Sequence, residues 1–250
     1  AVARPLSGTV VGGFERLNKM GAATLTLTGD HSYTAGTTIA AGTLQLGDGT
    51  ATGTLLGDVV NSGTLAFNRS DAYTFGGLIS GSGTVTQVGS GTTVLTGGNS
   101  YLGATTVEAG TLRVNGDQSA ATGLTTVRNG ATLGGGGIIG GDVLVENGGI
   151  LAPGNSPGVL TINGDLTLNN ASELAFEFGE ANVAGGLLND LIRVGGDLTL
   201  DGTLDVTVSS GGSFGPGIYR VFEYGGSLVD NDLTLGSLPV GSNAYLQTSV

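Results

Sequence analysis

Apolar and polar residues alternate over short stretches along most of the chain. Pairs of apolar residues one position apart recur at Leu25 and Leu27, Leu44 and Leu46, Leu166 and Leu168, and Leu198 and Leu200, and the triplet Leu204, Val206 and Val208 extends the pattern. Thr fills many of the positions between them. Because successive side chains of a strand point to opposite faces, a period of two indicates strands with one buried face. No window shows an apolar stripe at helical spacing, so we expect almost no helix.

Internal repeats are the second feature of the pattern. Thr24–Leu46 returns at Thr92–Val114 without a gap, and about half of the positions are identical. A shorter unit, Gly-Asp followed by two apolar residues one position apart, recurs at Gly57-Asp58, Gly141-Asp142, Gly164-Asp165 and Gly196-Asp197. Turn signals arrive roughly every 20 residues, which is a solenoid period. We therefore expect the offset between the two long copies to equal three turns of a solenoid.

Gly, Asn and Asp mark the expected corners between strands, because they tolerate positive φ best. Such pairs occur at Asp48-Gly49, Asn115-Gly116, Asn129-Gly130, Asn147-Gly148 and Asn163-Gly164. The run of four Gly at 134–137 lacks the Lys of a phosphate-binding loop and a following helix pattern, so we interpret it as a flexible corner.

These patterns predict an all-β fold, a right-handed parallel β-helix with about a dozen coils stacked at ~4.8 Å, roughly 55 Å long. An antiparallel sandwich is the alternative; it explains the alternation but not the ungapped recurrence. The pattern changes near residue 135, which divides the chain into a stalk (1–134) and a C-terminal cap (135–250). We expect the better-packed core in the last third, because it holds seven of the thirteen Phe and Tyr residues: Phe176, Phe178, Phe214, Tyr219, Phe222, Tyr224 and Tyr245.

Composition narrows the function classes. The chain has 8 basic and 20 acidic residues and a net charge of −12, which excludes nucleic acid as the main partner because phosphate binding needs a positive surface. No apolar run approaches the ~20 residues that span a bilayer. The first residues, AVARPLSGTVVGG, lack the apolar core of a signal peptide. We expect a mature segment cut from a longer protein.

The residue inventory argues against catalysis. The chain has no Cys and one His, so thiol nucleophiles, Cys-based zinc sites and two-histidine metal sites are excluded. His31 is the one candidate base near neutral pH, but Asn99 takes its place in the second repeat, so we interpret it as a turn residue. We therefore predict no catalytic residue, no cofactor-binding residue and no metal ligand.

The remaining chemistry-bearing residues have structural interpretations too. Tyr33 and Tyr101 occupy equivalent repeat positions, where they either form an exposed stacking ladder for sugars or, as we favour, cover coil corners. The late acids lack Ca²⁺-loop spacing. We expect Asp197, Asp201 and Asp205 to cap turns. We interpret Glu173, Glu177 and Glu180 as a solvated strand edge.

The repeated units at 24–46 and 92–114 resemble the passenger-associated β-strand repeats of bacterial autotransporters. A series of C-terminal segments is similar to the autochaperone region of pertactin-like autotransporters: LAPGNSPG at 151–158, NDLIRVGGDLTLDGTLDV at 189–206 and GIYRVFEYGG at 217–226. The resemblance covers about residues 21–250. It implies a surface-attached or secreted protein of a Gram-negative bacterium, exported through the periplasm, whose partner is its own C-terminal outer-membrane β-barrel, absent from this chain.

The resemblance implies a non-enzymatic stalk whose C-terminal part folds first and promotes folding and secretion of the rest. The residues expected to carry this role through burial are Leu198, Leu200, Leu204, Val206, Tyr219, Val221 and Phe222. The alternative is an adhesin that binds host matrix or glycans, or like passengers on neighbouring cells. A polysaccharide-active enzyme is the third hypothesis, and the residue inventory argues against it.

Overall fold

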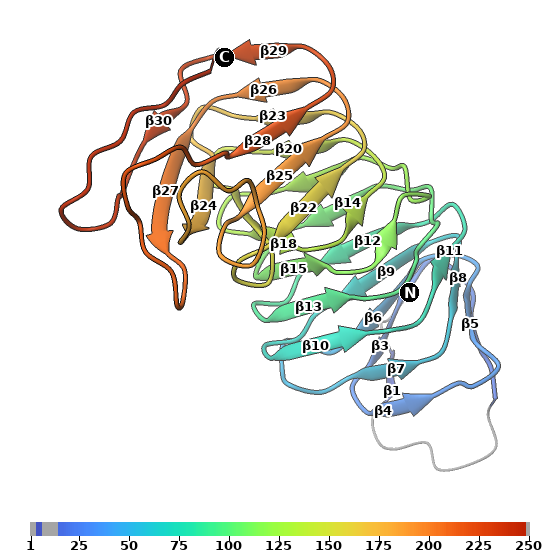
Figure 1. Ribbon diagram of the computed structural model, residues 1–250. Coiled ribbons are helices and arrows are strands. Elements are labelled where there is room, and N and C mark those ends of the chain that lie inside the picture. The colour runs from blue at the N-terminus through green and yellow to red at the C-terminus, as the bar shows by residue number, and fades with distance from the viewer. Residues whose placement is uncertain (1–3, 7–14, 249–250) are drawn as a thin grey trace.

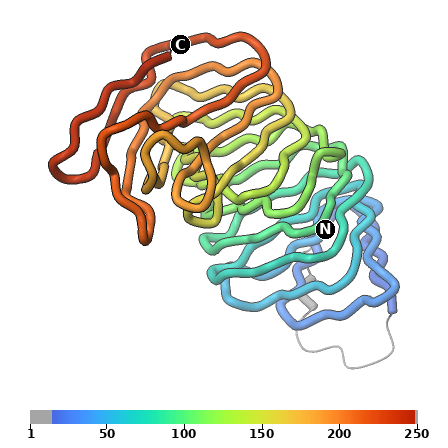
Figure 2. The backbone as a smooth tube through the Cα atoms, viewed as in Figure 1, coloured from blue at the N-terminus to red at the C-terminus, as the bar shows by residue number. Residues whose placement is uncertain are grey.

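The computed structural model describes residues 4–6 and 15–248, so most of the chain start discussed above lies outside the described residues. The described chain winds as coils of short strands stacked along one axis, from the N-terminal end to the C-terminal end (Figures 1 and 2). The strands form five sheets, and no helix occurs among the described residues. This confirms the expected all-β class.

The sheets follow the axis. Sheet 1 contains 11 strands: β1 (Arg4–Leu6), β3 (Thr24–Leu27), β6 (Thr43–Leu46), β9 (Thr64–Phe67), β12 (Thr84–Gln87), β14 (Thr105–Val107), β17 (Thr125–Val127), β20 (Val143–Val145), β23 (Leu166–Leu168), β26 (Leu198–Leu200) and β29 (Leu228–Asp230). Sheet 2 contains eight: β10 (Ala72–Phe75), β13 (Thr92–Leu95), β15 (Thr111–Val114), β18 (Thr132–Gly135), β21 (Ile150–Pro153), β24 (Glu173–Phe178), β27 (Thr203–Val208) and β30 (Thr234–Leu235).

Three smaller sheets complete the coils. Sheet 3 contains β2 (Leu17–Lys19), β5 (Thr37–Ile39), β8 (Val59–Asn61) and β11 (Ile79–Ser80). Sheet 4 contains β16 (Asp117–Gln118), β19 (Ile138–Ile139), β22 (Val159–Ile162), β25 (Leu191–Val194) and β28 (Phe222–Tyr224). Sheet 5 contains β4 (Asp30–Ser32) and β7 (Thr54–Leu56).

The chain visits the sheets in a fixed order. From β3 onward it passes from a strand of sheet 1 to sheet 5 or sheet 2, then to sheet 3 or sheet 4, and then returns to sheet 1 one coil later; in one coil β13 of sheet 2 leads directly to β14 of sheet 1. The paired strands within every sheet are parallel; for example, Leu44 of β6 lies opposite Leu65 of β9. This topology is the predicted parallel β-helix and not the antiparallel sandwich.

The core is a set of apolar columns inside the coils. Leu44, Leu65 and Val85 follow one another in register on sheet 1, and all three side chains are buried. Sheet 2 repeats the arrangement with Leu112, Leu133 and Leu151. Burial of a Leu or Val side chain stabilises the folded state by about 1.5–3 kcal/mol. The inward residues of each coil therefore depend on the coils before and after it.

The offset between the two long repeats is not three turns, and that expectation was wrong. Thr24 leads through its register partners Thr43 and Thr64 to Thr84, which lies three coils later on the same sheet. The second repeat begins further along the chain, at Thr92, which lies on sheet 2. In both copies the first strand of the unit pairs with the last strand at equivalent positions. The repeat thus encodes one coil and its local pairing. The first copy begins on sheet 1 and the second on sheet 2, so the two copies are rotated about the solenoid axis by one sheet.

Some glycines serve close approach and not positive φ. Gly49, Gly130 and Gly148 have positive φ, as expected for corners, but Gly116 and Gly164 do not. The run at 134–137 is not a flexible corner: its first two residues belong to β18, and a Cβ on Gly134 or Gly135 would overlap backbone of the neighbouring coils. Gly134 is needed because successive coils touch, and Gly135 combines such close approach with a positive φ.

Two cations are buried in the N-terminal half, which the sequence pattern did not indicate. The Arg69 guanidinium donates to the carbonyls of Ala51 and Gly53, each at 2.9 Å, pairs with Asp71 at 2.9 Å, and lies 4.8 Å from the centre of the Tyr73 ring. Lys19 donates from Nζ to two backbone carbonyls in the same manner. A buried charge is costly unless it is paired or hydrogen-bonded. Arg69 has both an ion pair and hydrogen bonds, and the Lys19 ammonium is held by backbone carbonyls.

The coils lengthen toward the C-terminus. In the middle of sheet 1, Val85 pairs with Thr105, whereas further on Leu166 pairs with Leu198 and Leu198 with Leu228, so that these two late coils contain more residues than the middle ones. The added residues form two excursions between sheets 2 and 4, at 179–190 and 209–221. Both leave the coil path at the C-terminal end (Figure 2). The uniform coil of about 20 residues expected from the turn signals therefore holds only for the earlier coils.

Replacing an inward leucine should cost far more than replacing an exposed one. Leu133→Ala removes a buried side chain between Leu112 and Leu151, so the free energy of unfolding should fall by about 2–5 kcal/mol. Leu187→Ala is the matched control, because Leu187 is 91 % exposed. Urea unfolding followed by circular dichroism measures both variants, and equal losses would contradict the assigned core.

Candidate functional site

His31 is not a turn residue, as the sequence suggested, but the central residue of β4, with a side chain 1 % exposed. Its Nδ1 lies 3.4 Å from the Tyr33 hydroxyl, and the two rings are stacked. Burial lowers the pKa of His31, against a smaller opposing effect of Asp30. Its repeat counterpart Asn99 is also buried and accepts the Ile79 N–H at 2.8 Å. Both residues are interior polar groups, which explains their exchange between repeats.

The two repeat-related tyrosines do not form a surface ladder. Tyr33 and Tyr101 are both buried, and the Tyr101 hydroxyl lies 2.6 Å from Oγ1 of Thr105. Burial raises the pKa of Tyr101 to about 12. Because the repeat units are turned by one face, the two rings also belong to different faces of the solenoid. They cover the interior and present no stacking surface to a sugar.

The late acids occupy structural positions. Asp197 and Asp205 accept the N–H of Ser227 and Ser237 from the following coil, and Asp201 accepts the N–H of Gly202. Asp201 therefore caps a turn as expected, whereas Asp197 and Asp205 bind the backbone of the following coil, and Asp205 lies within β27 and not in a turn. Glu173 does not mark a strand edge, because it pairs with Ile150 of β21 on one side and with Thr203 of β27 on the other. Glu177 has a register partner only in β27, and Glu180 lies after the end of β24. In the described part of the chain no three His, Cys, Asp or Glu residues are arranged to hold a metal ion.

The residues expected to carry the folding role divide into two groups. Leu198, Leu200, Leu204 and Val206 are buried in the core. Tyr219, Val221 and Phe222 are half-buried and pack against that core. From Val208 onward most of the described residues are exposed or half-buried, so the tightest packing ends before the last coil. The expected dense core therefore does not extend to the C-terminal strands, where Tyr224 and Tyr245 are exposed.

Aromatic side chains connect the last long coils. The Phe176 and Phe178 rings of β24 are buried. Phe176 meets Phe222 edge-on at 6.1 Å, and Phe178 lies 5.2 Å from Tyr219, which stacks on Phe214 at 4.5 Å. Such ring pairs add about 0.5–1.5 kcal/mol each beyond area burial. The excursion at 209–221 is thereby held against the coil that precedes it.

Asn189 and Asp190 fasten the other excursion, and sequence reasoning did not single them out for this role. The Asn189 side chain accepts the N–H of Gly179 and Glu180 and donates to the carbonyls of Glu180 and Val183. The two excursions are joined to each other because the Asn182 Oδ1 accepts the Ile218 N–H. The sequence signal was an Asn-Asp pair directly before the apolar run LIRV.

Asp190 joins two successive coils. The residue is 1 % exposed, and its carboxylate accepts the N–H of Gly158 and of Glu177, each at 2.7 Å. Burial raises the pKa of Asp190 to about 7, and the Glu177 carboxylate adds to the rise, although both N–H donors oppose it. Glu177 in turn accepts the hydroxyl of Ser156, which belongs to the loop between β21 and β22. This clamp holds the 153–158 loop against β24.

A shallow cavity of about 250 Å³ lies beside the clamp on sheet 2. Its lining includes Arg113, Ala152, Ser156, Glu177, Asp190 and Asp205. Small residues create the depression, since Ala152 lies beside Gly134 on the outward face and Ala175 lies beside Asp205. No His lies there, and the Ser156 hydroxyl donates to Glu177. The arrangement provides no activated nucleophile.

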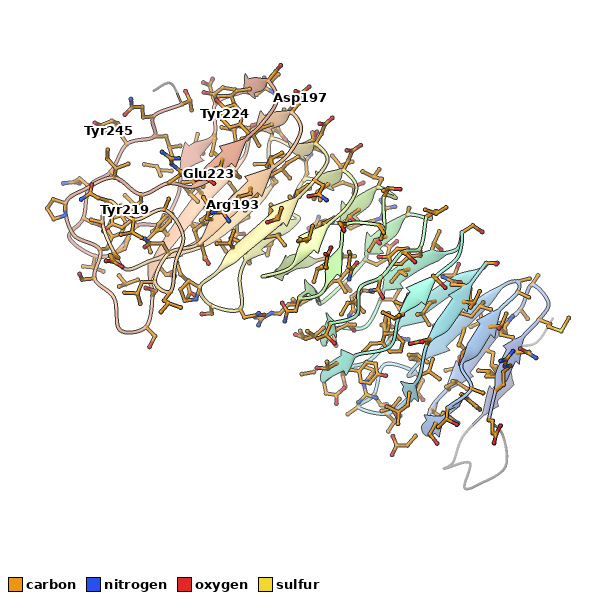
Figure 3. The ribbon with its side chains drawn as sticks, turned by 45° about the vertical axis from the view of Figure 1, so that its right-hand side comes forward. Arg193, Asp197, Tyr219, Glu223, Tyr224 and Tyr245 are labelled. Atoms are coloured by element: carbon orange, nitrogen blue, oxygen red, sulfur yellow. The ribbon has the colours of Figure 1, made fainter. Side chains whose placement is uncertain are left out.

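An ion-pair network covers sheet 4 at the same end. Nε of Arg193 lies 2.9 Å from Glu223, and Arg220 lies 3.3 Å from the same carboxylate. The two arginines lower the pKa of Glu223 through hydrogen bonds and charge, Arg193 most. Figure 3 shows Arg193 and Glu223 side by side, with Tyr219 in the neighbouring excursion. Exposed ion pairs contribute little stability, about 0–1 kcal/mol. The clamp and the aromatic contacts therefore dominate.

The Asp190 clamp should give the protein a distinctive pH dependence. Its folded pKa of about 7 lies above the ordinary 3.8, so its contribution is fully present below about pH 4 and is lost as pH rises toward 7, by at most roughly 1.4 kcal/mol per pH unit. Urea unfolding of wild type and Asp190→Asn from pH 4 to 8 measures the free energy of unfolding of each. Subtracting the two curves removes the contributions of other titrating groups such as His31. Asp48→Asn, at an exposed corner, is the matched control for the loss of one surface carboxylate. Parallel curves for Asp190→Asn would contradict the assignment.

Comparison with known proteins agrees with the repeat structure. The passenger-associated-transport-repeat family matches residues 17–46 and 85–114, and each of these two spans contains one copy of the long repeated unit. No helix in the described part of the chain is long and apolar enough to cross a bilayer.

Two curated proteins are similar to this chain. It is 58 % identical over 214 residues, 84 % of its length, to the Adhesin BmaC autotransporter of Brucella suis biovar 1 (strain 1330), of which the match covers 6 %. It is 32 % identical over 130 residues, half of its length, to an Extracellular serine protease of Serratia marcescens, of which the match covers 12 %. The chain thus spans a small part of either relative. The repeats, the parallel β-solenoid and the likeness to the Brucella protein identify the chain as a segment of an autotransporter passenger domain.

Proposed function

We propose that residues 135–250 act as the folding seed of a passenger whose earlier coils, 1–134, form a stalk. The observation that supports this most is the set of side-chain clamps at 156–222, where Asp190 joins its coil to the preceding one and Asn189 closes the 179–190 excursion. The aromatic contacts of Phe176 and Phe178 with the second excursion add to them.

A solenoid needs such a seed for a physical reason. Each coil buries apolar surface only against its neighbours, so the first coil to fold gains little and the following coils gain more. An end that is fastened by its own long coils lowers the cost of this first step. It then offers strand edges to which further coils can pair.

Membership of the autotransporter passengers supports a proposal for the direction of folding and for the location. Autotransporter passengers are joined to their own outer-membrane β-barrel, so we propose this barrel as the partner and the cell surface or the external medium as the location. If the C-terminal part emerges first, as the family implies, coils that add to it would draw the chain outward. Folding would thereby support secretion across the outer membrane.

Adhesion is a second candidate function for the intact protein. The Brucella relative is named an adhesin, and the outward face of sheet 1 carries Thr86, Thr106 and Thr126 in register. A flat, half-exposed row of hydroxyls can hydrogen-bond a glycan, a matrix protein or a like passenger. This role is compatible with the seed, because it uses the stalk.

We propose no catalysis for this segment. The Serratia relative is named a serine protease, but the match covers a small part of it. In this chain His31 is buried beside Tyr33 and cannot reach a substrate.

Disrupting the seed should lower surface display. Leu204→Asp places a charge in the core of β27, and we expect display of the passenger to fall at least severalfold because the last coils cannot pack. Val221→Asp, at a half-buried position, should reduce display less. Antibody labelling of intact cells measures both, with Leu187→Asp as the exposed control. Normal display and protease resistance of Leu204→Asp would contradict the seed role.

A further inference from the structure

The recurring Gly-Asp units build a ladder of carboxylates along one corner of the solenoid. Asp142, Asp165 and Asp197 directly precede successive strands of sheet 1. Oδ1 of Asp142 accepts the N–H of Asp165 at 2.9 Å, and Oδ1 of Asp165 accepts the N–H of Asp197 at 2.7 Å. Oδ1 of Asp197 accepts the N–H of Ser227 at 2.7 Å. Each carboxylate is thus bound by the coil on its C-terminal side.

The backbone completes a two-point contact at each step. The N–H of Val143 donates to the carbonyl of Asp165, and the N–H of Leu166 donates to that of Asp197, at 2.8 and 2.9 Å. Both backbone groups of a corner residue such as Asp165 are therefore held by the preceding coil. Its N–H donates to the side chain of Asp142, and its carbonyl accepts the N–H of Val143, the residue that follows Asp142. Hydrogen bonds to a charged carboxylate are roughly twice as strong as neutral ones.

The glycine of each unit makes room for this contact. A Cβ on Gly164 would overlap Oδ1 of Asp142, and a Cβ on Gly196 would overlap Oδ1 of Asp165. Neither glycine has positive φ, so the requirement is steric. In each Gly-Asp unit the Gly leaves space for the carboxylate of the preceding coil, and the Asp supplies the carboxylate that binds the following coil.

The ladder coincides with the proposed seed. One coil before Asp142 the equivalent residue is Leu124, which has no carboxylate, and at the other end Ser227 offers none. In the stalk, Asp58 accepts the N–H of Leu78 in the same way. Leu78 has no carboxylate, so no further contact of this kind follows it. Three consecutive rungs thus lie within 135–250.

We infer that this ladder is the surface on which coils dock during folding, and that its partner is the Asp of the next coil to arrive from the N-terminal side. The inference rests on the proposed seed function. A folded coil presents the corner N–H in a fixed position, and the incoming coil supplies a carboxylate on a short, mobile side chain. The backbone bond of the following residue then forms beside it. Docking in this direction needs only the template to be ordered in advance.

The test is pulse-labelled hydrogen exchange during refolding of the full chain from urea, read by mass spectrometry. In wild type, peptides from β26 and β29 should become protected before those from β23 and β20. In Asp165→Ala the first step should be unchanged. Protection of β23 and β20 should be delayed about tenfold, because their coil has lost its charged contact with Asp197.

Matched variants separate docking from general damage. Asp165→Asn keeps an acceptor oxygen and should recover most of the rate. Asp201→Ala removes a carboxylate that contacts Gly202 within its own corner, so it should not delay β23 and β20 selectively. Gly196→Ala should reproduce Asp165→Ala, whereas Gly215→Ala, with open space around it, should not.

The outcomes distinguish the two proposals. If wild-type protection does not begin at the C-terminal coils, the seed function itself is wrong. If it begins there but Asp165→Ala refolds like wild type, or slows every coil equally, the ladder is not the docking surface and the seed function stands.

Discussion

A strand in this molecule can complete its backbone hydrogen bonds only with the strands of the coils before and after it. Its buried side chains also pack along the axis, in columns such as Leu112, Leu133 and Leu151, as well as across the interior of their own coil, where Phe67 of β9 meets Phe75 of β10. Every coil is therefore stable only as part of a stack, and the ends are the weakest places. How the C-terminal end is held together is the central question for both fold and function.

At the C-terminal end, side-chain contacts provide the stability that regular stacking of the coils provides elsewhere. The last coils are longer and more exposed, and they are fastened by Asp190, by Asn189 and by aromatic contacts that bring two excursions back to the stack. In the same region, Asp carboxylates at the corners of successive coils accept backbone N–H groups of the next coil. These contacts are sparse in number but directional, which suits a part of the passenger that must fold before its neighbours. An adhesive stalk built on this base would need no chemistry of its own beyond its outer faces.

The local pattern predicted the strands, the parallel solenoid and the repeat, because alternation and turn residues act within one coil. It did not predict where around the axis a residue would lie, since that depends on the summed length of all earlier coils. The turned repeat, the buried His31 and the packed glycines at 134–137 are errors of this kind. Asp190 was missed for a related reason: its two N–H donors, Glu177 and Gly158, lie far from it in the sequence. Contacts between coils join residues that are far apart in the chain, so the pattern within a short stretch of sequence does not reveal them.

Limited proteolysis across a urea series, with mass spectrometry of the surviving fragments, tests the central claim most directly. If the C-terminal coils form a separately stable seed, a fragment spanning roughly 135–250 will survive after the stalk has been digested. The strongest clamps, between Gly158 and Asp190, should lie within it. A single cooperative loss of the whole chain would contradict the account, because it would show a uniform rod with no end more stable than the other.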